Sequence, residues 1–145
     1  MEINIKKVKE NATIPTRGSE YAAGYDLYAC IEEDLVIQPH TSVMISTGIS
    51  LEIPVNYAGL IYARSGLASK KDLAPANKVA VIDSDYRGEV FVVLHNHGTK
   101  EQTITVNERI AQFVFTPFLP VTFNEVDKLS ETLRGEGGFG STGRN

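Results

Sequence analysis

The sequence has no tryptophan, only one cysteine among 145 residues, and no apolar run long enough to cross a membrane. One thiol cannot form an internal disulfide or, by itself, a zinc site. Because Cys30 lies in an apolar stretch, we expect it to be buried and the protein to occupy a reducing compartment. The N-terminus interleaves lysines with isoleucine and valine and has no apolar signal segment. We therefore expect a soluble, cytoplasmic protein with no membrane partner.

Basic residues are outnumbered by acidic ones, 14 against 18, and the formal net charge is -4. A general nucleic-acid binder needs a basic face to displace counterions, so we expect no nucleic-acid partner. A few well-placed cations are enough for a small anion, and the net charge does not exclude such a ligand. The length and the 42% hydrophobic content predict one domain with an ordinary core.

Helical periodicity is scarce, and short apolar alternations separated by proline and glycine dominate the chain. From Val43 to Ile53 every odd position is valine, isoleucine, threonine or leucine, which is the period of a strand with one buried face. This spacing is typical of an all-β sandwich or barrel. The pattern predicts one short helix over residues 65–73, with Ser65 as its N-cap, and a weaker helix over residues 125–133.

The composition changes sharply near the C-terminus. Five of the nine residues 135–143 are glycine, and residues 138–143 match the dinucleotide fingerprint G-x-G-x-x-G. Only two residues of the sequence follow, so no helix can aim at a pyrophosphate there, and the pattern is not a Rossmann site. Two interpretations remain: a flexible phosphate clamp beside Arg134, or an unstructured tail. We expect a β domain over residues 1–133 and a flexible glycine-rich tail over residues 134–145.

Three polar segments interrupt the apolar runs. Arg64, Ser65 and Gly66 lie where a strand meets the short helix, and their amide and guanidinium groups suit an anion, although a plain helix cap has the same pattern. Asp83 directly follows an apolar strand, where a half-buried carboxylate suits general-base work, or it belongs to a hairpin turn. Asp26 lies between apolar neighbours and either holds a metal's water or caps a strand.

His95 and His97 are two positions apart and would share one face of a strand. No third ligand lies nearby in the sequence. The pattern favours a solvated turn over a zinc site.

Five segments, taken together and in order, resemble the motifs of the trimeric dUTP pyrophosphatase (dUTPase) family. They are Ala23-Gly24-Tyr25-Asp26-Leu27; Ala63-Arg64-Ser65-Gly66-Leu67; Val81-Ile82-Asp83 with Tyr86-Arg87-Gly88-Glu89; Glu108-Arg109-Ile110-Ala111-Gln112; and Arg134-Gly135 with Phe139-Gly140-Ser141-Thr142-Gly143. The resemblance covers nearly the whole chain. It implies an all-β, distorted jelly-roll-like barrel with one short helix, assembled as a homotrimer whose active sites are shared between three chains.

The resemblance also implies the reaction, which is the hydrolysis of dUTP to dUMP and pyrophosphate with Mg²⁺. By similarity, Asp83 is the catalytic residue and deprotonates the water that attacks the α-phosphorus. Asp26 orders metal-bound water, while the substrate phosphates hold most of the Mg²⁺. Phosphoryl transfer needs in-line positioning and neutralised oxygens more than covalent help, which agrees with these roles.

The substrate-binding residues implied by the resemblance fall into three groups. The first contacts the nucleoside, the second contacts the phosphates, and the third belongs to the tail that closes over the substrate. Asn77, Val81 and Ile82 line the uracil pocket, and Tyr86 packs under the deoxyribose. Arg64, Ser65, Gly66 and Gln112 hold the phosphates. Phe139 closes over the uracil, and Arg134, Gly140, Ser141 and Thr142 reach toward the γ-phosphate.

The roles of Arg109, Ala80 and Asp72 do not follow directly from the resemblance. Arg109 is flanked by Glu108 and an apolar residue, which favours an ion-pair partner over a phosphate ligand. Members of the family commonly have glycine where this chain has Ala80 and Asp72, and an alanine would be strained if its backbone required a positive φ. Two other functions are weighed against dUTP hydrolysis: a dCTP deaminase-like enzyme and a non-catalytic nucleotide-binding trimer.

Overall fold

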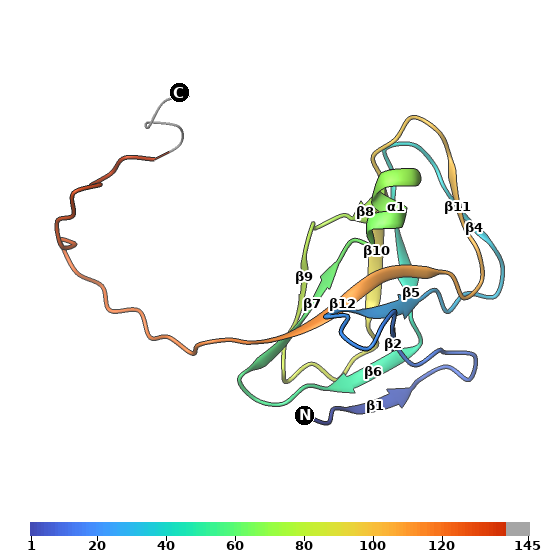
Figure 1. Cartoon of the computed structure of the whole chain (residues 1–145), viewed down its shortest axis with the longest axis horizontal. Coiled ribbons are helices and arrows are strands. Elements are labelled where there is room, and N and C mark those ends of the chain that lie inside the picture. The colour runs from blue at the N-terminus through green and yellow to red at the C-terminus, as the bar shows by residue number, and fades with distance from the viewer. Residues whose placement is uncertain (139–145) are drawn as a thin grey trace.

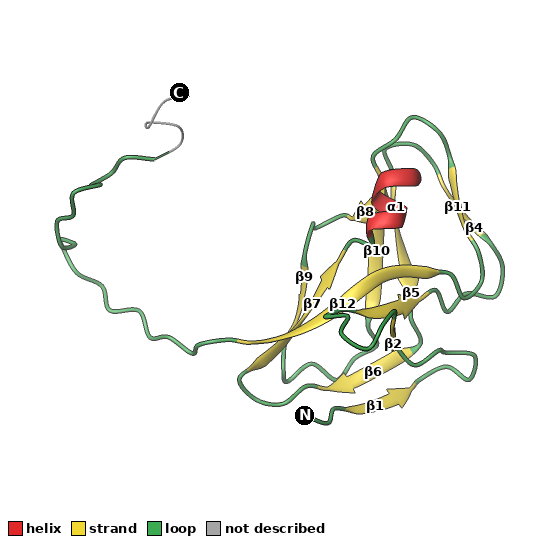
Figure 2. Cartoon of the chain, viewed as in Figure 1, coloured by secondary structure: helices red, strands yellow, loops and turns green. Residues whose placement is uncertain are grey.

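Strands dominate the chain, as the alternation predicts. The computed structural model describes residues 1–138, which contain twelve strands and one helix (Figures 1 and 2). In chain order the elements are β1 (Asn4–Lys7), β2 (Thr16–Arg17), β3 (Tyr25–Tyr28), β4 (Leu35–Ile37), β5 (Ser42–Ser46), β6 (Ile49–Glu52), β7 (Tyr57–Tyr62), α1 (Ser65–Lys70), β8 (Leu73–Pro75), β9 (Ala80–Ile82), β10 (Phe91–Asn96), β11 (Gln102–Ile104) and β12 (Arg109–Pro117).

The strands form antiparallel sheets around one core. The largest sheet has the order β2-β3-β12-β7-β9, a second has the order β5-β10-β8, and the pairs β1-β6 and β11-β4 complete the domain. The core is built from inward-facing aliphatic side chains and one phenylalanine, Phe113, which is fully buried. This architecture confirms the predicted all-β class with one short helix. Within the described residues no helix is long and apolar enough to cross a membrane.

Strand β12 lies at the centre of the largest sheet and carries a bulge. Arg109 pairs with Tyr28 of β3, and Ala111 pairs with the adjacent Leu27. Ile110 is therefore an extra residue on β12 with no partner of its own on β3. Ile110 and Ala111 are consecutive and both are fully buried, whereas a regular strand would alternate. The bulge therefore turns Arg109 to the outer face of the sheet, the face that also carries Gln112.

The alternation from Val43 to Ile53 belongs to two strands and not to one. The chain bends at Thr47 and Gly48 between β5 and β6, and Gly48 has a φ of +68°. A side chain on Gly48 would also collide with Cys30, which is buried as expected. The buried face continues through the bend, and for this reason the sequence pattern showed no interruption.

The helix predictions need three corrections. Helix α1 ends at Lys70 and residue 73 already begins β8, because Asp72 adopts a φ of +53° that no α-helix accommodates. The N-cap is Arg64, in an extended conformation without a side-chain cap, and Ser65 is the first helical residue. No helix forms over residues 125–133, where the chain is exposed and lacks a surface to pack against.

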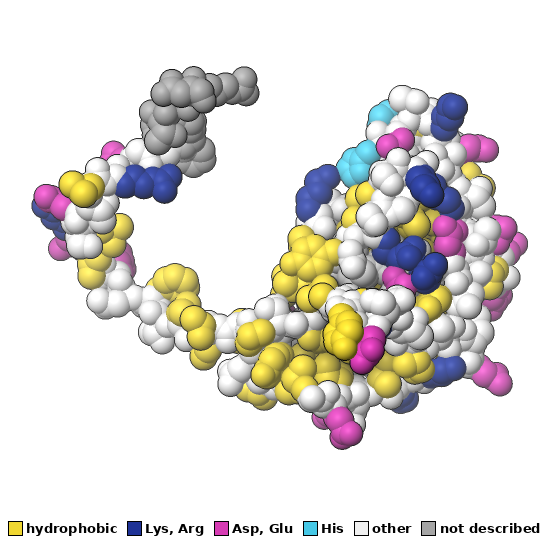
Figure 3. Space-filling model, viewed as in Figure 1, with side chains coloured by type: hydrophobic (Ala, Val, Ile, Leu, Met, Phe, Trp, Pro, Cys, Tyr) yellow, Lys and Arg dark blue, Asp and Glu magenta, His cyan; other side chains and the backbone are white. Residues whose placement is uncertain are grey.

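Residues 118–138 leave β12 as an extended arm that lies away from the domain (Figure 1). Figure 3 shows apolar side chains along this arm. Six of them are largely exposed: Leu119, Val121, Phe123, Val126, Leu129 and Leu133. A single copy of the domain offers these side chains no cover.

The two positions where the family that the chain resembles commonly has glycine, Ala80 and Asp72, behave differently. Ala80 lies in β9, paired with Ile61 of β7, and is not among the described residues with a positive φ. Alanine is therefore unstrained there. Asp72 does have a positive φ, and its carbonyl accepts the His97 amide at 2.9 Å. Aspartate tolerates this conformation better than most residues other than glycine.

Candidate functional site

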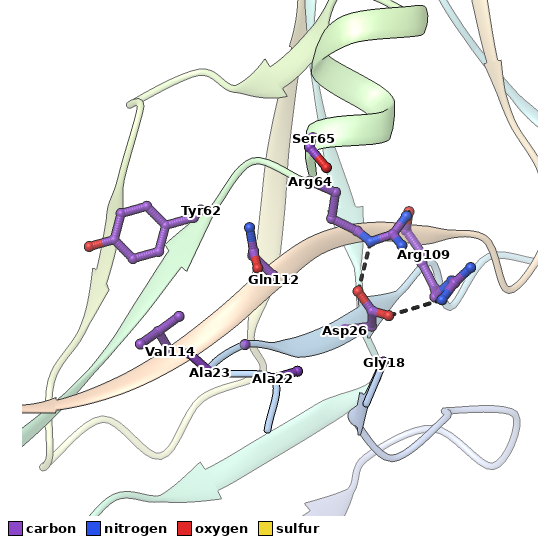
Figure 4. A pocket seen from close by; sticks show the side chains of 11 residues that line it. Gly18, Ala22, Ala23, Asp26, Tyr62, Arg64, Ser65, Arg109, Gln112 and Val114 are labelled. Atoms are coloured by element: carbon purple, nitrogen blue, oxygen red, sulfur yellow. Dashed lines mark hydrogen bonds and ion pairs between the residues drawn. The ribbon is translucent and has the colours of Figure 1, made fainter. Parts of the chain in front are cut away.

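A pocket of about 350 Å³ opens over the outer face of the largest sheet, beside the start of α1 (Figure 4). Its side chains come from the β2–β3 connection and from β3, β7, α1 and β12. The lining residues are Gly18, Ala22, Ala23, Gly24, Asp26, Tyr62, Arg64, Ser65, Arg109, Gln112 and Val114. We call this space the cationic pocket, because two arginines and one carboxylate are its charged groups.

The cross-strand register explains why these residues meet. Gln112 of β12 lies opposite Asp26 on one side and opposite Tyr62 on the other. The three side chains therefore form one row across the sheet, on the face that points away from the core. Three segments far apart in the sequence reach the pocket through this row.

Asp26 is held between the two arginines. Its Oδ1 accepts a hydrogen bond from Arg64 Nε at 2.7 Å, and its Oδ2 accepts one from Arg109 Nη1 at 3.2 Å. Arg64 Nη1 also donates to the backbone carbonyl of Arg109 at 3.2 Å. The Asp26 side chain is 12% exposed, and the arginines are 22% and 51% exposed. The carboxylate thus orients both guanidinium groups at the pocket wall, and the interpretation of Arg109 as an ion-pair partner is confirmed.

Gln112 is oriented by the backbone. Its Nε2 donates to the Ala63 carbonyl at 2.9 Å, which directs Oε1 toward Gly24. A Cβ at Gly24 would lie 2.6 Å from that oxygen. Glycine at this position therefore leaves room for the Gln112 amide at the pocket wall.

Of the three residues predicted at the start of the helix, Arg64 and Ser65 line the pocket. Ser65 is exposed and is the first residue of α1. Gly66 is exposed but is not part of the wall, and a Cβ there would meet nothing within 4 Å.

A second pocket, of about 220 Å³, lies between β9 and β10. It is lined by Val81, Ile82, Asp83, Tyr86, Glu89 and Phe91, and we call it the hairpin pocket. The structure therefore brings four sequence-predicted residues together here: Val81, Ile82, Asp83 and Tyr86. Asn77 is exposed on the β8–β9 connection and does not line this pocket.

Tyr86 and Asp83 belong to one tight loop. The Tyr86 amide donates to the Asp83 carbonyl at 3.2 Å, and the Tyr86 hydroxyl donates to the Glu89 carbonyl at 2.9 Å. Gly88 lies against the Tyr86 ring, where a Cβ would collide with the phenol. Asp83 is exposed in the single chain, so the predicted half-buried position is wrong, because the strand ends one residue before it.

The two pockets lie at opposite ends of β7. Ile82 pairs with Gly59, so Asp83 follows at the level of Ala58, whereas Arg64 comes two residues after the end of β7. Six residues of extended chain span about 20 Å. That distance is longer than the three linked phosphates of a nucleotide. The two pockets of one protein copy therefore cannot bind the same triphosphate group.

Arg134, the predicted tail residue that the structure describes, is not brought to either pocket. Arg134 lies in the arm, where its Nε donates to the Gly137 carbonyl at 2.8 Å. Phe139, Gly140, Ser141 and Thr142 lie outside the described residues. His95 differs from the expected turn, since it belongs to β10 and its Nδ1 lies 2.9 Å from Ser42 Oγ, whereas His97 follows the strand and is exposed as expected. Among residues 1–138 no cluster of three or more metal-ligating side chains forms.

Residues that sequence reasoning did not assign to a site complete both pockets. Tyr62 and Gly24 line the first, and Glu89 and Phe91 line the second. Gly24 and Glu89 belong to segments that resemble the family motifs. Tyr62 and Phe91 end or begin strands, and only the strand register reveals their position.

A partly buried ion pair between Lys71 and Glu108 fixes α1 against the strands beside it. Lys71 Nζ donates to Glu108 Oε1 at 2.7 Å and to the Thr103 carbonyl at 2.9 Å, and the Thr105 amide donates to Glu108 Oε2 at 2.9 Å. Burial alone would raise the pKa of Glu108, but the hydrogen bonds from Lys71 and Thr105 outweigh it and lower the pKa. This contact holds the helix that presents Ser65 next to the strand that presents Arg109.

Comparison with known proteins gives consistent results. The family model described as dUTPase matches residues 10–143. The chain is 46% identical, over 99% of both sequences, to the deoxyuridine 5'-triphosphate nucleotidohydrolase of Hydrogenobaculum sp., and 44% identical to that of Nautilia profundicola over 99% of this chain and 100% of the relative. A solved structure of the Staphylococcus bacteriophage 80alpha dUTPase with dUPNHPP superposes with a TM-score of 0.89 at 28% identity, over 99% of each chain.

The Lys71–Glu108 contact predicts a pH-dependent loss of stability. In Lys71→Met the free energy of unfolding at neutral pH should fall by about 1–2 kcal/mol. Since the folded pKa of Glu108 is lowered, its contribution is fully present above the unfolded value near 4.5 and disappears as the pH falls below it. The difference between the variant and the wild type should therefore narrow from about pH 6 to about pH 3.

Urea unfolding at a series of pH values measures this difference. Lys70→Met is the matched control, since Lys70 lies on the same helix and is exposed. A Lys71→Met deficit that stays constant across the acid range contradicts the assigned ion pair.

Proposed function

This chain belongs to the dUTPase family, and we propose that it hydrolyses dUTP to dUMP and pyrophosphate. The observation that carries the proposal is the pair of pockets: one holds oriented cations and the other places an exposed carboxylate next to an apolar strand and a tyrosine ring. A nucleoside triphosphate has matching parts, an anionic chain and an apolar base and sugar.

In this proposal Asp83 is the catalytic base. Its exposed carboxylate takes a proton from a water molecule as the water oxygen attacks the α-phosphorus. The bond between the α-phosphorus and the bridging oxygen breaks, and pyrophosphate leaves with the electron pair. Val81 and Ile82 of β9 receive the uracil, together with Asn77 of the preceding β8–β9 connection. The Tyr86 ring lies under the deoxyribose, where a 2′-hydroxyl would have no room.

The cationic pocket receives the phosphate chain. Arg64 is already oriented by Asp26, so little side-chain entropy is lost when a phosphate binds. Ser65 and Gly66 contribute a hydroxyl and exposed amides, and Gln112 contributes an amide whose Nε2 is fixed by the backbone. Fixed donors stabilise the charge that develops on the leaving pyrophosphate without reorganisation.

The donor set fits Mg²⁺. This ion prefers oxygen ligands, keeps several waters, and is usually bound by one or two carboxylates together with substrate phosphates. Asp26 supplies one carboxylate in the pocket, and its position between two arginines suits contact through a water better than direct ligation. When bound, the ion would neutralise phosphate oxygens.

The proposal includes a homotrimer with shared active sites, as is typical of the family, and the separation of the two pockets supports it. The cationic pocket and the hairpin pocket of one chain are about 20 Å apart along β7, so a complete site needs the two pockets from different copies. The exposed apolar arm over residues 118–138 also requires a second copy as its cover.

We extend the proposal to the end of the chain and to its cellular location. In this proposal residues 1–133 are the β domain together with most of its arm, and residues 134–145 close over the bound nucleotide through Arg134, Phe139, Gly140, Ser141 and Thr142. A glycine-rich segment has too little apolar surface to offset its ordering entropy, so substrate would supply the missing contacts. The buried free thiol of Cys30 supports a reducing, cytoplasmic compartment.

The two alternatives lack support from particular residues. A dCTP deaminase-like enzyme would need a further acid at the base-reading strand, and the other carboxylate lining the hairpin pocket, Glu89, is already engaged by Ser46 and Gly48. A non-catalytic trimer would have no use for the exposed Asp83.

Pyrophosphate release tests the proposed reaction. The protein with Mg²⁺ should release pyrophosphate rapidly from dUTP and far more slowly from UTP, dTTP and dCTP. Absence of release from dUTP, or equal release from UTP, would overturn the proposal. Ammonia from dCTP would favour the deaminase alternative.

Asp83→Asn should retain nucleotide binding and lose about three orders of magnitude in kcat, since a general base typically contributes a factor of 10² to 10⁴. Asp85→Asn, in the same exposed loop, is the matched control and should keep near-normal turnover. Binding of a non-hydrolysable dUTP analogue by calorimetry separates lost affinity from lost chemistry. Normal turnover by Asp83→Asn would exclude Asp83 as the base.

A chain truncated after Leu133 should fold and assemble like the full chain but turn over dUTP at least tenfold more slowly, because it loses about 1.4 kcal/mol or more of closing contacts. Light scattering checks assembly, and pyrophosphate release checks turnover. An unimpaired truncated enzyme would show that residues 134–145 have no role in catalysis.

A further inference from the structure

The carboxylate of Glu89 connects the Tyr86 loop to the body of the domain. Its Oε1 accepts hydrogen bonds from the Ser46 hydroxyl and, at 2.9 Å, from the Gly48 amide. Ser46 ends β5, and Gly48 forms the bend before β6. Glu89 is therefore anchored to a part of the chain that lies more than forty residues earlier.

The bend that holds Glu89 is itself fixed. The Gly48 carbonyl accepts the Val8 amide at 2.8 Å, and its Cα is packed so closely that a Cβ would lie 2.7 Å from Cys30 Sγ and from Ala12 Cβ. The next residue after Glu89 is held too, since the Val90 amide donates to the Ile49 carbonyl at 2.8 Å. The Glu89 peptide therefore has little freedom to move.

That peptide in turn holds the Tyr86 ring. The Tyr86 hydroxyl donates to the Glu89 carbonyl at 2.9 Å, and Gly88 lies against the phenol. The other side-chain tie between this loop and the body is Arg87 with Glu52, at 3.9 Å and more than half exposed at both ends. An exposed ion pair of that length contributes little rigidity.

We propose that Glu89 is a positioning residue which, through its own carbonyl, fixes the Tyr86 ring and thereby sets the discrimination between deoxyribose and ribose. The proposal rests on the proposed function, in which the Tyr86 ring lies under the sugar. Rejection of a 2′-hydroxyl requires a wall that does not yield, because a loose ring would move aside to admit the extra oxygen. Glu89 acts as a hydrogen-bond acceptor here, and its negative charge is secondary.

Three variants test this assignment through the ratio of kcat/KM for UTP to that for dUTP. Glu89→Ala removes the acceptor and should raise the ratio about tenfold, as expected for the loss of one to two hydrogen bonds to a charged group. Glu89→Gln keeps an oxygen at the Oε1 position and should stay within about twofold of the wild type. Glu52→Gln, the matched control, changes the exposed tie of the same loop and should leave the ratio unchanged.

A double-mutant cycle tests whether the effect runs through the phenol. Tyr86→Phe removes the hydroxyl that Glu89 holds, so adding Glu89→Ala to it should change the ratio much less than Glu89→Ala does alone. A purely structural role for Glu89 would lower the melting temperature without altering the ratio. If Glu89→Ala fails to fold, Ser46→Ala removes one donor and should raise the ratio about threefold.

The outcomes separate this inference from the proposed function. Failure of the wild type to hydrolyse dUTP overturns the proposed function. A wild type selective for dUTP with an unchanged ratio in Glu89→Ala, or in Ser46→Ala where that variant is used, overturns the role of Glu89 and leaves the function intact. A Glu89→Gln ratio equal to that of Glu89→Ala overturns it too, because charge and not the acceptor would then be required.

Discussion

The position of β12 between β3 and β7 is the constraint on which the rest of the structure depends. Its hydrogen-bond register places Gln112 in one row with Asp26 and Tyr62, and a slip of one residue would turn all of β12 to the opposite face. The bulge before Ala111 then brings Arg109 to the same outer face without disturbing the buried side. One strand thus satisfies the core and supplies two groups of the cationic pocket.

The same sheet keeps the two pockets of one copy apart. Antiparallel pairing of β9 with β7 carries Asp83 toward the end of β7 that is remote from Arg64. Each pocket lies on hydrogen-bonded strands, because β7 pairs with β12 on one side and with β9 on the other. In the proposed function another copy completes the site, and the arm that leaves β12 with exposed apolar side chains is open to the same contact. The proposal therefore links assembly and catalysis to one topology.

The sequence predicted the fold class and much of each pocket, because both follow from local features. Alternation identified the buried faces correctly, and the polar segments at strand ends contained Arg64, Asp83 and Tyr86. It could not separate β5 from β6, since the buried face continues through the bend at Gly48. It misplaced the helix cap, because an extended arginine at that position leaves no signal in the residue types. The partners of Asp26 and the anchors of Glu89 depend on pairing between distant segments, which residue types do not specify.

Net charge was a poor guide to the ligand because charge acts locally. The chain carries -4 overall, yet Arg64, Arg109 and Asp26 sum to a single positive charge within one pocket. Asp26 cancels one of the two positive charges of that pocket. It also keeps two guanidinium groups close together, where unpaired they would repel each other and spread into solvent. The carboxylate thus keeps both guanidinium groups oriented, and in the proposed function such fixed donors need no reordering when a phosphate arrives.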